Sequence, residues 1–344
     1  MRVYIDGQDG RGWHLDTERR SLQDSLRRLG IDEANGIVSA DIVHNLCWQT
    51  ILSDYRFPLI RRKRSVLLTA SNFIVPQDPS YALQSEYRRL AGVARAWIAP
   101  SLRQKSILEK EGLKVFYQPF YLDLNLFKPQ DTGKELLAST LGIPKELVAN
   151  RVVIGSFQRD SLGTNLTQPK WQKGPELLIG LLKALPRDRF LLLLAGPRRH
   201  YVLRECKVHN IPYFYLGRET SEDDLDTNIA GIAHMPTLYA MCDIYLVTSV
   251  SEGGPKAVIE AAATKTFILS TDVGLAGDFL NRHNVCSYPT NYAKELQELV
   301  VNNARHKERI TRDVCEQYER CVRILGRASM DRRLLSIYEE ALGA

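Results

Sequence analysis

Thr248-Ser-Val-Ser-Glu-Gly-Gly-Pro-Lys-Ala-Val-Ile-Glu260 sets the local architecture on either side of it. The run before it, Asp243-Ile-Tyr-Leu-Val-Thr248, is short, apolar and β-branched, which predicts a buried strand and not a helix. Gly253 and Gly254 break that strand, and Pro255 suits the first position of a helix. A strand–turn–helix unit of this kind points backbone N–H groups and the positive end of a helix dipole at an anion above the sheet.

The same stretch contains two acids, Glu252 in the turn and Glu260 eight residues later. A rise of about 1.5 Å per residue places them up to roughly 12 Å apart. An isolated pair at this spacing is most often a pair of solvated helix acids. Here a small-residue helix, Ala257–Ala263, and a second predicted strand, Thr266–Thr271, follow the turn. This context favours a binding site over a solvated pair.

The arrangement resembles the donor-binding signature of family 4 retaining glycosyltransferases with the GT-B fold, in which two glutamates are separated by seven residues. The resemblance implies an α/β fold of two Rossmann-like domains whose parallel sheets face each other across a cleft. It also implies that a C-terminal helix crosses back to the first domain. The implied activity is that of a hexosyltransferase-type enzyme, which moves a sugar from a nucleotide-diphosphate sugar to a hydroxyl of a glycan or a lipid-linked acceptor.

Predicted strands and helices alternate along the whole chain, which is typical of parallel sheets covered by helices on both faces. We expect an acceptor-side domain over residues 1–130, a linker over 131–150, a donor-nucleotide domain over 151–325 and a C-terminal helix over 326–344. The predicted strands cover residues 2–5, 41–44, 66–69, 96–99, 115–118, 152–157, 190–194, 213–216, 243–247 and 266–270. A further helix is expected over Ser80–Ala91, and the tail is expected to be helical over Lys307–Leu342.

The bulk properties fit two ordinary globular domains, with 344 residues, 44% apolar and 25% charged. The longest apolar run, Phe190–Ala195, is far too short to span a bilayer. The opening residues do not have the pattern of a signal peptide. The six cysteines show no Cys-x-x-Cys spacing, so we expect reduced thiols in a cytoplasmic protein and no structural zinc.

The positive charge is concentrated early in the chain, where residues 1–130 contain 19 Lys and Arg against 14 Asp and Glu. The run Arg61-Arg-Lys-Arg64 is the densest part of this excess. A solvated loop that keeps the protein soluble explains such a run. The functional alternative is peripheral contact with an anionic membrane, which would place the protein on the inner membrane face. No basic stretch is interleaved with stacking aromatic residues, so we expect no nucleic-acid partner.

Transfer from a nucleotide sugar leaves a diphosphate whose growing negative charge must be stabilised, and fixed cations do this where no metal is used. The resemblance assigns Arg159, after the first strand of the second domain, and Lys173, at the start of the next helix, to the diphosphate. Lys170 is close enough to compete with Lys173 for this role. The alternative for each is an exposed charge at the end of an element. No metal or other cofactor is expected.

The resemblance also implies roles for the acids and for the turn between them. Glu252 accepts hydrogen bonds from hydroxyls of the donor sugar, while Glu260 binds the ribose hydroxyls. The N–H groups of Gly253, Gly254 and Lys256 face the far edge of the sugar. The family is retaining, and no residue here stands out as a covalent nucleophile. The resemblance therefore implies a front-face mechanism in which the leaving phosphate takes the proton of the acceptor.

Gly7-Gln-Asp-Gly-Arg-Gly12 follows the first predicted strand, at the edge where open α/β sheets bind ligands. Gly10 and Gly12 are therefore candidates for close approach to the donor phosphates, and an ordinary turn is the alternative. The loop lacks the third glycine and the later acid of a dinucleotide fingerprint. His14 adjoins it and is a candidate for the acceptor side.

A histidine that the family places after a middle strand of its first domain has no counterpart here, because Val66-Leu-Leu-Thr69 continues as Ala70-Ser-Asn-Phe73. Asn72 is a candidate to replace it. His44 is another acceptor-side candidate, and a buried structural histidine is the alternative.

Asp224-Leu-Asp226 has the form of an Asp-x-Asp metal site but lies in a polar acidic run, so we interpret it as a solvated loop. Two rival functions stay open. One is a sugar-nucleotide epimerase of the same fold, and the other is a catalytically silent GT-B protein that acts as a binding or scaffold subunit.

Overall fold

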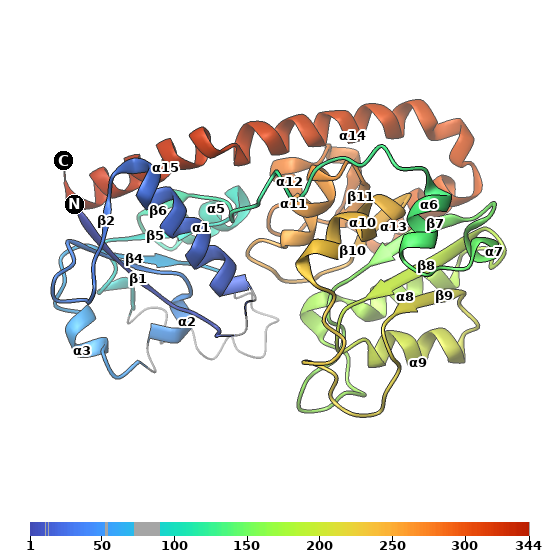
Figure 1. Cartoon of the computed structure of the whole chain (residues 1–344), viewed down its shortest axis with the longest axis horizontal. Coiled ribbons are helices and arrows are strands. Elements are labelled where there is room, and N and C mark those ends of the chain that lie inside the picture. The colour runs from blue at the N-terminus through green and yellow to red at the C-terminus, as the bar shows by residue number, and fades with distance from the viewer. Residues whose placement is uncertain (11, 13, 52–53, 72–89, 344) are drawn as a thin grey trace. The chain divides into compact units, whose positions relative to one another are not determined.

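The chain forms two compact units in a computed structural model that describes residues 1–10, 12, 14–51, 54–71 and 90–343 (Figure 1). Unit 1 comprises Met1–Tyr121, Ser251–Gly254 and Arg323–Ala344, and unit 2 comprises Leu122–Val250 and Pro255–Val322. Most of the helix expected over Ser80–Ala91 lies outside the described residues.

Unit 1 is built on a six-stranded parallel sheet with the order β2-β1-β3-β4-β5-β6. Its central strands are buried along their whole length, as parallel strands with helices on both faces must be. The strands are β1 (Arg2–Asp6), β2 (Asp32–Glu33), β3 (Ile42–Asn45), β4 (Val66–Thr69), β5 (Ala96–Ala99) and β6 (Val115–Tyr117).

Helices cover both faces of this sheet. One face packs with α1 (His14–Leu29) and the last helix, α15 (Arg327–Leu342), and the other packs with α2 (Trp48–Ile51), α3 (Phe57–Ile60) and α5 (Leu102–Lys110). Leu334, Ile337 and Tyr338 of α15 are buried in the core of unit 1, and Arg28 forms a bidentate ion pair with Asp331. The C-terminal helix therefore packs on the first domain, as the resemblance implied.

Unit 2 has a second six-stranded parallel sheet, with the order β12-β11-β10-β7-β8-β9. Its order reverses between β7 and β10, so the carboxyl ends of these two neighbours form a switch point at which ligands bind in open α/β sheets. The strands are β7 (Val152–Ser156), β8 (Phe190–Ala195), β9 (Tyr213–Leu216), β10 (Ile244–Val247), β11 (Phe267–Thr271) and β12 (Val285–Cys286).

The helices of unit 2 again form two layers. The core on one face includes side chains from α8 (Pro175–Lys183), α9 (His200–Val208) and α13 (Pro289–Val301), and the core on the other includes α6 (Lys134–Thr140), α7 (Lys145–Val148) and α10 (Met235–Met241). Residues 131–150, expected as a linker with a helical stretch over Lys134–Leu141, contain α6 and α7 and bury Leu137 and Ile143 in this second core. The helices α11 (Lys256–Ala263) and α12 (Ala276–Phe279) complete the unit, with α14 (Asn303–Leu325) up to Val322.

The α/β fold with two parallel sheets is confirmed, and every strand expected from the sequence is present close to its expected bounds. Two edge strands, β2 and β12, were not expected, because each has only two residues and carries no alternation. The helical tail is also divided, since α14 ends at Leu325 and Gly326 precedes α15.

Candidate functional site

The turn after β10 has the expected strand–turn–helix form with one correction. Pro255 occupies the N-cap position, with φ of −66°, and α11 begins at Lys256. The expectation that Pro255 is the first helical residue is wrong by one position. Ser251–Gly254 groups with unit 1 although it connects two elements of unit 2. Within it Glu252 is half-buried and Gly253 is buried.

Lys173 and Gly174 are held against the end of β10 by a network of hydrogen bonds. The carbonyl oxygen of Lys173 accepts from Gln158 Nε2 at 3.1 Å and from Thr248 Oγ1 at 3.1 Å. Gly174 has a left-handed φ of 58°, and a β-carbon there would lie 2.0 Å from the carbonyl oxygen of Thr248. Only glycine fits both the backbone conformation and the space. The Lys-Gly turn is thus fixed at the switch point, beside the loop that carries Gln158 and Arg159.

Arg159 is half-buried, three residues beyond the end of β7. Burial lowers the pKa of its guanidinium, and the nearby positive charge of Arg198 lowers that pKa further. Arg198 itself is paired with Asp223 through two bonds, from Nε at 2.9 Å and from Nη2 at 2.7 Å. Two cations, Arg159 and Arg198, therefore lie beyond the carboxyl ends of β7 and β8. Of the two, Arg159 is partly desolvated.

A buried ion pair that sequence reasoning missed lies next to these cations. Arg199 and Asp160 are 1% exposed, and Arg199 Nε is 3.2 Å from Asp160 Oδ2. The other carboxylate oxygen, Asp160 Oδ1, accepts from the backbone N–H of Tyr201 at 3.2 Å, in the first turn of α9. The backbone carbonyl of Asp160 accepts from Lys170 N at 2.6 Å. Asp160 thus joins the loop after β7, the loop before Lys173 and the start of α9.

Glu260 is held by a second residue that the sequence did not single out. Tyr239, on α10, is 1% exposed and donates its hydroxyl hydrogen to Glu260 Oε2 at 2.7 Å. Burial raises the pKa of the Glu260 carboxyl, while the Tyr239 hydrogen bond and the charge of Lys256 lower it. A tyrosine inside an amphipathic helix gives no sequence signal of such a contact.

The N–H groups of the glycine-rich loop after β1 are used within unit 1. Asp16, in the first turn of α1, accepts at Oδ1 from Asp9 N at 2.9 Å and from Gly10 N at 3.2 Å, and at Oδ2 from Gly12 N at 2.7 Å. These bonds, above all that from Gly12, lower the pKa of Asp16. A donor phosphate that used Gly10 and Gly12 would have to displace this carboxylate. The sequence interpretation did not foresee Asp16 as their partner.

The acceptor-side candidates lie in different surroundings. The ring of His14 meets Phe120 edge to face, with centroids 4.4 Å apart. His44 is buried, its Nδ1 2.8 Å from the Tyr338 hydroxyl and its Nε2 3.2 Å from Thr69 Oγ1. These contacts favour the alternative of a structural histidine over an acceptor contact. Asn72 lies outside the described residues.

The acidic run contains a second correction. Asp224 is only 3% exposed and accepts hydrogen bonds from Arg198 N and Asn228 Nδ2, both at 2.7 Å. The expectation of a solvated loop is therefore wrong for Asp224, which instead organises its neighbours. Over the described residues, no group of three or more His, Cys, Asp or Glu side chains is arranged to hold a metal ion.

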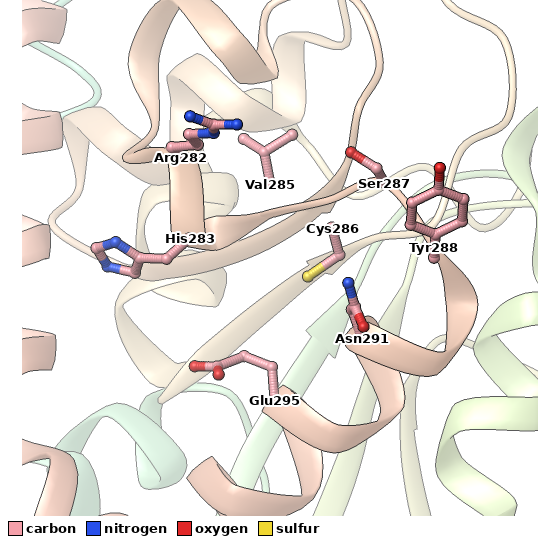
Figure 2. A pocket seen from close by; sticks show the side chains of 8 residues that line it. All are labelled: Arg282, His283, Val285, Cys286, Ser287, Tyr288, Asn291 and Glu295. Atoms are coloured by element: carbon pink, nitrogen blue, oxygen red, sulfur yellow. The ribbon is translucent and has the colours of Figure 1, made fainter.

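An open depression of about 590 Å³ lies beside the edge strand β12 (Figure 2). Of the site residues expected from the sequence, none that the structure describes lines it. Burial raises the pKa of its thiol, Cys286, to about 11, so the thiol stays protonated and is a poor nucleophile near neutral pH. Its lining residues are Arg282, His283, Val285, Cys286, Ser287, Tyr288, Asn291 and Glu295.

Residues 165–318, a little under half of the chain, match the family described as Glycosyl transferases group 1. No curated protein gives a significant sequence match to the chain. Among the residues that the structure describes, no helix combines the length and the apolar character needed to cross a bilayer.

Solved structures resemble the chain over nearly its whole length. Sucrose-phosphate synthase from Thermosynechococcus elongatus aligns with a TM-score of 0.73 and 13% identity, covering 99% of each chain. HepE from Anabaena, solved in complex with UDP-glucose, aligns with a TM-score of 0.70 and 15% identity, covering 99% of this chain and 100% of that one. A glycosyltransferase from Rickettsia africae aligns with a TM-score of 0.65 and 15% identity, covering 99% and 98%. The chain therefore has the GT-B fold.

Proposed function

We propose that this protein is a metal-independent retaining glycosyltransferase that takes its sugar from a nucleoside-diphosphate sugar. The observation that carries the proposal is that Gln158, the neighbour of Arg159, bonds the Lys173–Gly174 turn at the carboxyl ends of β7 and β10. This is the switch point of the unit that contains the match to glycosyl transferases group 1. That HepE was solved with UDP-glucose supports a nucleotide sugar as donor.

The electrostatics of this region suit an anionic leaving group. Burial and the charge of Arg198 both make the charged form of Arg159 less favourable. A diphosphate beside Arg159 would therefore offset the free-energy cost of keeping that side chain charged. Fixed cations of this kind stabilise negative charge where it develops in a transition state, without reorganisation. Arg159 and Lys173 are assigned to the diphosphate, with Lys170 as the neighbour that competes with Lys173.

The acids and the turn between them complete the proposed donor site. Glu252 accepts hydrogen bonds from the hydroxyls of the transferred sugar, and Glu260 accepts from the ribose hydroxyls. The backbone N–H groups of Gly253, Gly254 and Lys256 face the far edge of the sugar. Gly10 and Gly12 contribute to the phosphates only if Asp16 is displaced.

The proposed chemistry retains the anomeric configuration. The bond from the anomeric carbon to the phosphate oxygen breaks, and a bond from the acceptor oxygen forms on the same face. The departing phosphate oxygen takes the proton of the acceptor hydroxyl, so neither a covalent enzyme nucleophile nor a metal is required. The acceptor is a hydroxyl of a glycan or a lipid-linked sugar.

Unit 1 supplies a surface suited to a lipid-linked acceptor, for a protein that acts at the inner face of the cytoplasmic membrane. Tyr55 is 90% exposed and Leu59 44%, and both precede the exposed Arg61, Arg62 and Arg64 in the chain, while Val38 is 78% exposed. Lys63 joins the two segments, because its Nζ donates to the carbonyl oxygens of Val38 at 2.9 Å and of Ala40 at 2.6 Å. We call these exposed residues the basic face: Val38, Tyr55, Leu59, Arg61, Arg62 and Arg64.

A screen of UDP-, GDP- and ADP-sugars for binding, turnover and product anomer tests the function. We expect transfer or slow hydrolysis of one donor, with retention, at a rate that EDTA leaves unchanged. Glu252→Ala and Arg159→Ala should each lower the rate on the order of a hundredfold, the size expected when one group that stabilises a transition state is removed. The matched control, Arg218→Ala, removes an exposed arginine of unit 2 and should be near neutral.

The other outcomes separate the rivals. Tight binding without turnover would indicate a scaffold protein, and interconversion of the free donor would indicate an epimerase. Full activity in both site variants would refute the assignment of Glu252 and Arg159.

A further inference from the structure

We infer that Tyr239 is a positioning residue that aims the Glu260 carboxylate at the ribose and so sets discrimination between ribose and 2′-deoxyribose. The inference rests on the proposed function, in which Glu260 accepts from the ribose hydroxyls. Tyr239 itself touches no substrate in this scheme.

The first step is the contact between the two side chains. The Tyr239 hydroxyl lies 2.7 Å from Glu260 Oε2, and the tyrosine is 1% exposed while the glutamate is half-buried. A long carboxylate side chain has several rotamers, and ordering it on binding costs free energy. A buried donor that holds one oxygen removes most of that cost before the ligand arrives, and it leaves the half-buried side chain oriented.

The second step is what fixes Tyr239. Its ring packs against Phe157 at a centroid distance of 5.3 Å and against Tyr245 at 5.0 Å, and Phe157 and Tyr245 lie 5.2 Å apart. Three mutually packed rings leave the Tyr239 hydroxyl little freedom to move. Its position is therefore set by the core and not by solvent.

The third step links the three packed rings to Arg159, which is assigned to the diphosphate. The Tyr245 hydroxyl accepts from the backbone N–H of Phe157 at 3.2 Å, and Phe157 precedes Arg159 by two residues. One rigid group of rings thus supports both Glu260 and the strand end that carries Arg159. Tyr239 is the member of the group that contacts the ribose-binding acid, so its loss should affect ribose recognition more than diphosphate binding.

The test compares Tyr239→Phe with the wild type in calorimetric titrations. The probes are whichever of UDP, GDP and ADP binds best, and its 2′-deoxy counterpart. We expect the wild type to prefer the ribonucleotide about tenfold, the factor that corresponds to about 1.4 kcal/mol. Tyr239→Phe keeps the ring and should reduce that preference to about threefold or less, with affinity for the deoxynucleotide nearly unchanged. Glu260→Ala should abolish the preference.

The matched control is Tyr213→Phe, because Tyr213 donates to Glu219 at 2.8 Å in another Tyr–Glu pair of the same unit. That control should leave the preference as in the wild type. A purely structural role for Tyr239 would weaken both nucleotides equally, and an unchanged ratio in Tyr239→Phe would overturn the inference.

Failure of the proposed function gives a different result. A wild type that binds no nucleoside diphosphate would overturn both proposals. A wild type that binds the ribo and deoxy forms equally would overturn only the role of Glu260 and Tyr239 in ribose recognition. Thermal unfolding of each variant, followed by circular dichroism, confirms that the comparison is between folded proteins.

Discussion

A β-carbon on Gly174 would lie 2.0 Å from the carbonyl oxygen of Thr248, so the turn that carries Lys173 can approach β10 only because residue 174 is glycine. That approach lets the carbonyl of Lys173 accept hydrogen bonds from Gln158 and from Thr248. The turn proposed to bind the diphosphate, Lys173–Gly174, is therefore positioned by a backbone contact as well as by the hydrogen bonds to it.

Gly174→Ala should disrupt this contact. A forced shift of packed backbone costs about 1–3 kcal/mol, and the left-handed φ adds to that cost. We expect the free energy of unfolding of unit 2 to fall by about 2 kcal/mol or more in urea titrations, with nucleotide affinity falling as well. Gly180→Ala, inside the helix α8 that Gly174 caps, is the matched control. A β-carbon at Gly180 meets nothing within 4 Å, so this change should stabilise by roughly 0.5–1 kcal/mol.

Asp160→Ala should be costly for a different reason. It would leave Arg199, which is 1% exposed, without its carboxylate partner. Removing one member of a buried ion pair typically costs about 3–5 kcal/mol. Asp223→Ala removes the partner of Arg198 at the surface and should cost about 1 kcal/mol or less. Equal losses in urea unfolding would contradict the view that the buried Asp160–Arg199 pair contributes more than a surface pair.

Asp16→Ala should loosen the glycine-rich loop of unit 1. Without the carboxylate, the N–H groups of Gly10 and Gly12 lose the acceptor that now binds them at 3.2 and 2.7 Å. Their amide hydrogen exchange should rise, because each N–H loses a charged acceptor, which binds more strongly than a neutral one. Asp24→Ala removes an exposed acid from the same helix and should leave that exchange unchanged.

His44 should make unit 1 less stable in mild acid. Burial lowers its pKa from 6.5 to about 4, so between these values the unfolded chain binds a proton that the folded state does not. Stability is therefore lost as the pH falls from 6.5 towards 4. Between about pH 7 and about pH 5 the loss should approach about 2 kcal/mol. His44→Gln should flatten this part of the unfolding profile, whereas His234→Gln, at an exposed histidine, should not.

The basic face should bind anionic vesicles. Each basic residue near such a surface is worth about 1 kcal/mol, so serine at Arg61, Arg62 and Arg64 together should weaken binding on the order of a hundredfold. Co-sedimentation with phosphatidylcholine vesicles, with and without phosphatidylserine, measures this. Serine at Lys145, Lys183 and Lys294, which are exposed in unit 2, changes net charge equally and should have a smaller effect. Equal loss in both triple variants would indicate that only overall charge matters.

The predictability of the fold followed the strength of the local signal. Two elements could be predicted from local sequence: β8, which has six consecutive apolar residues, and the turn before α11. The two-residue strands β2 and β12 do not, because they exist only through their pairing with β1 and β11. The region over 131–150 carries polar and glycine breaks that resemble a linker, and only packing shows that Leu137 and Ile143 are buried.

For the candidate site too, residues in local motifs could be predicted from the sequence, and residues paired over long distances could not. Arg159, Lys173, Glu252 and Glu260 could be proposed from the sequence because the motifs that carry the family resemblance are short and local. Asp160 with Arg199, and Tyr239 with Glu260, are separated by 39 and 21 residues, and no local pattern joins them.

By itself the sequence determined the alternation of strands and helices and the residues at the carboxyl ends of β7 and β10, because apolar periodicity and turn chemistry act over a few neighbouring residues. Only the tertiary structure decided which partners those residues have. Gly174 lies against Thr248, Asp16 binds the glycine loop, His44 is buried against Tyr338 and Tyr239 holds Glu260. Such contacts depend on how the layers pack in three dimensions, and distance along the chain says little about that.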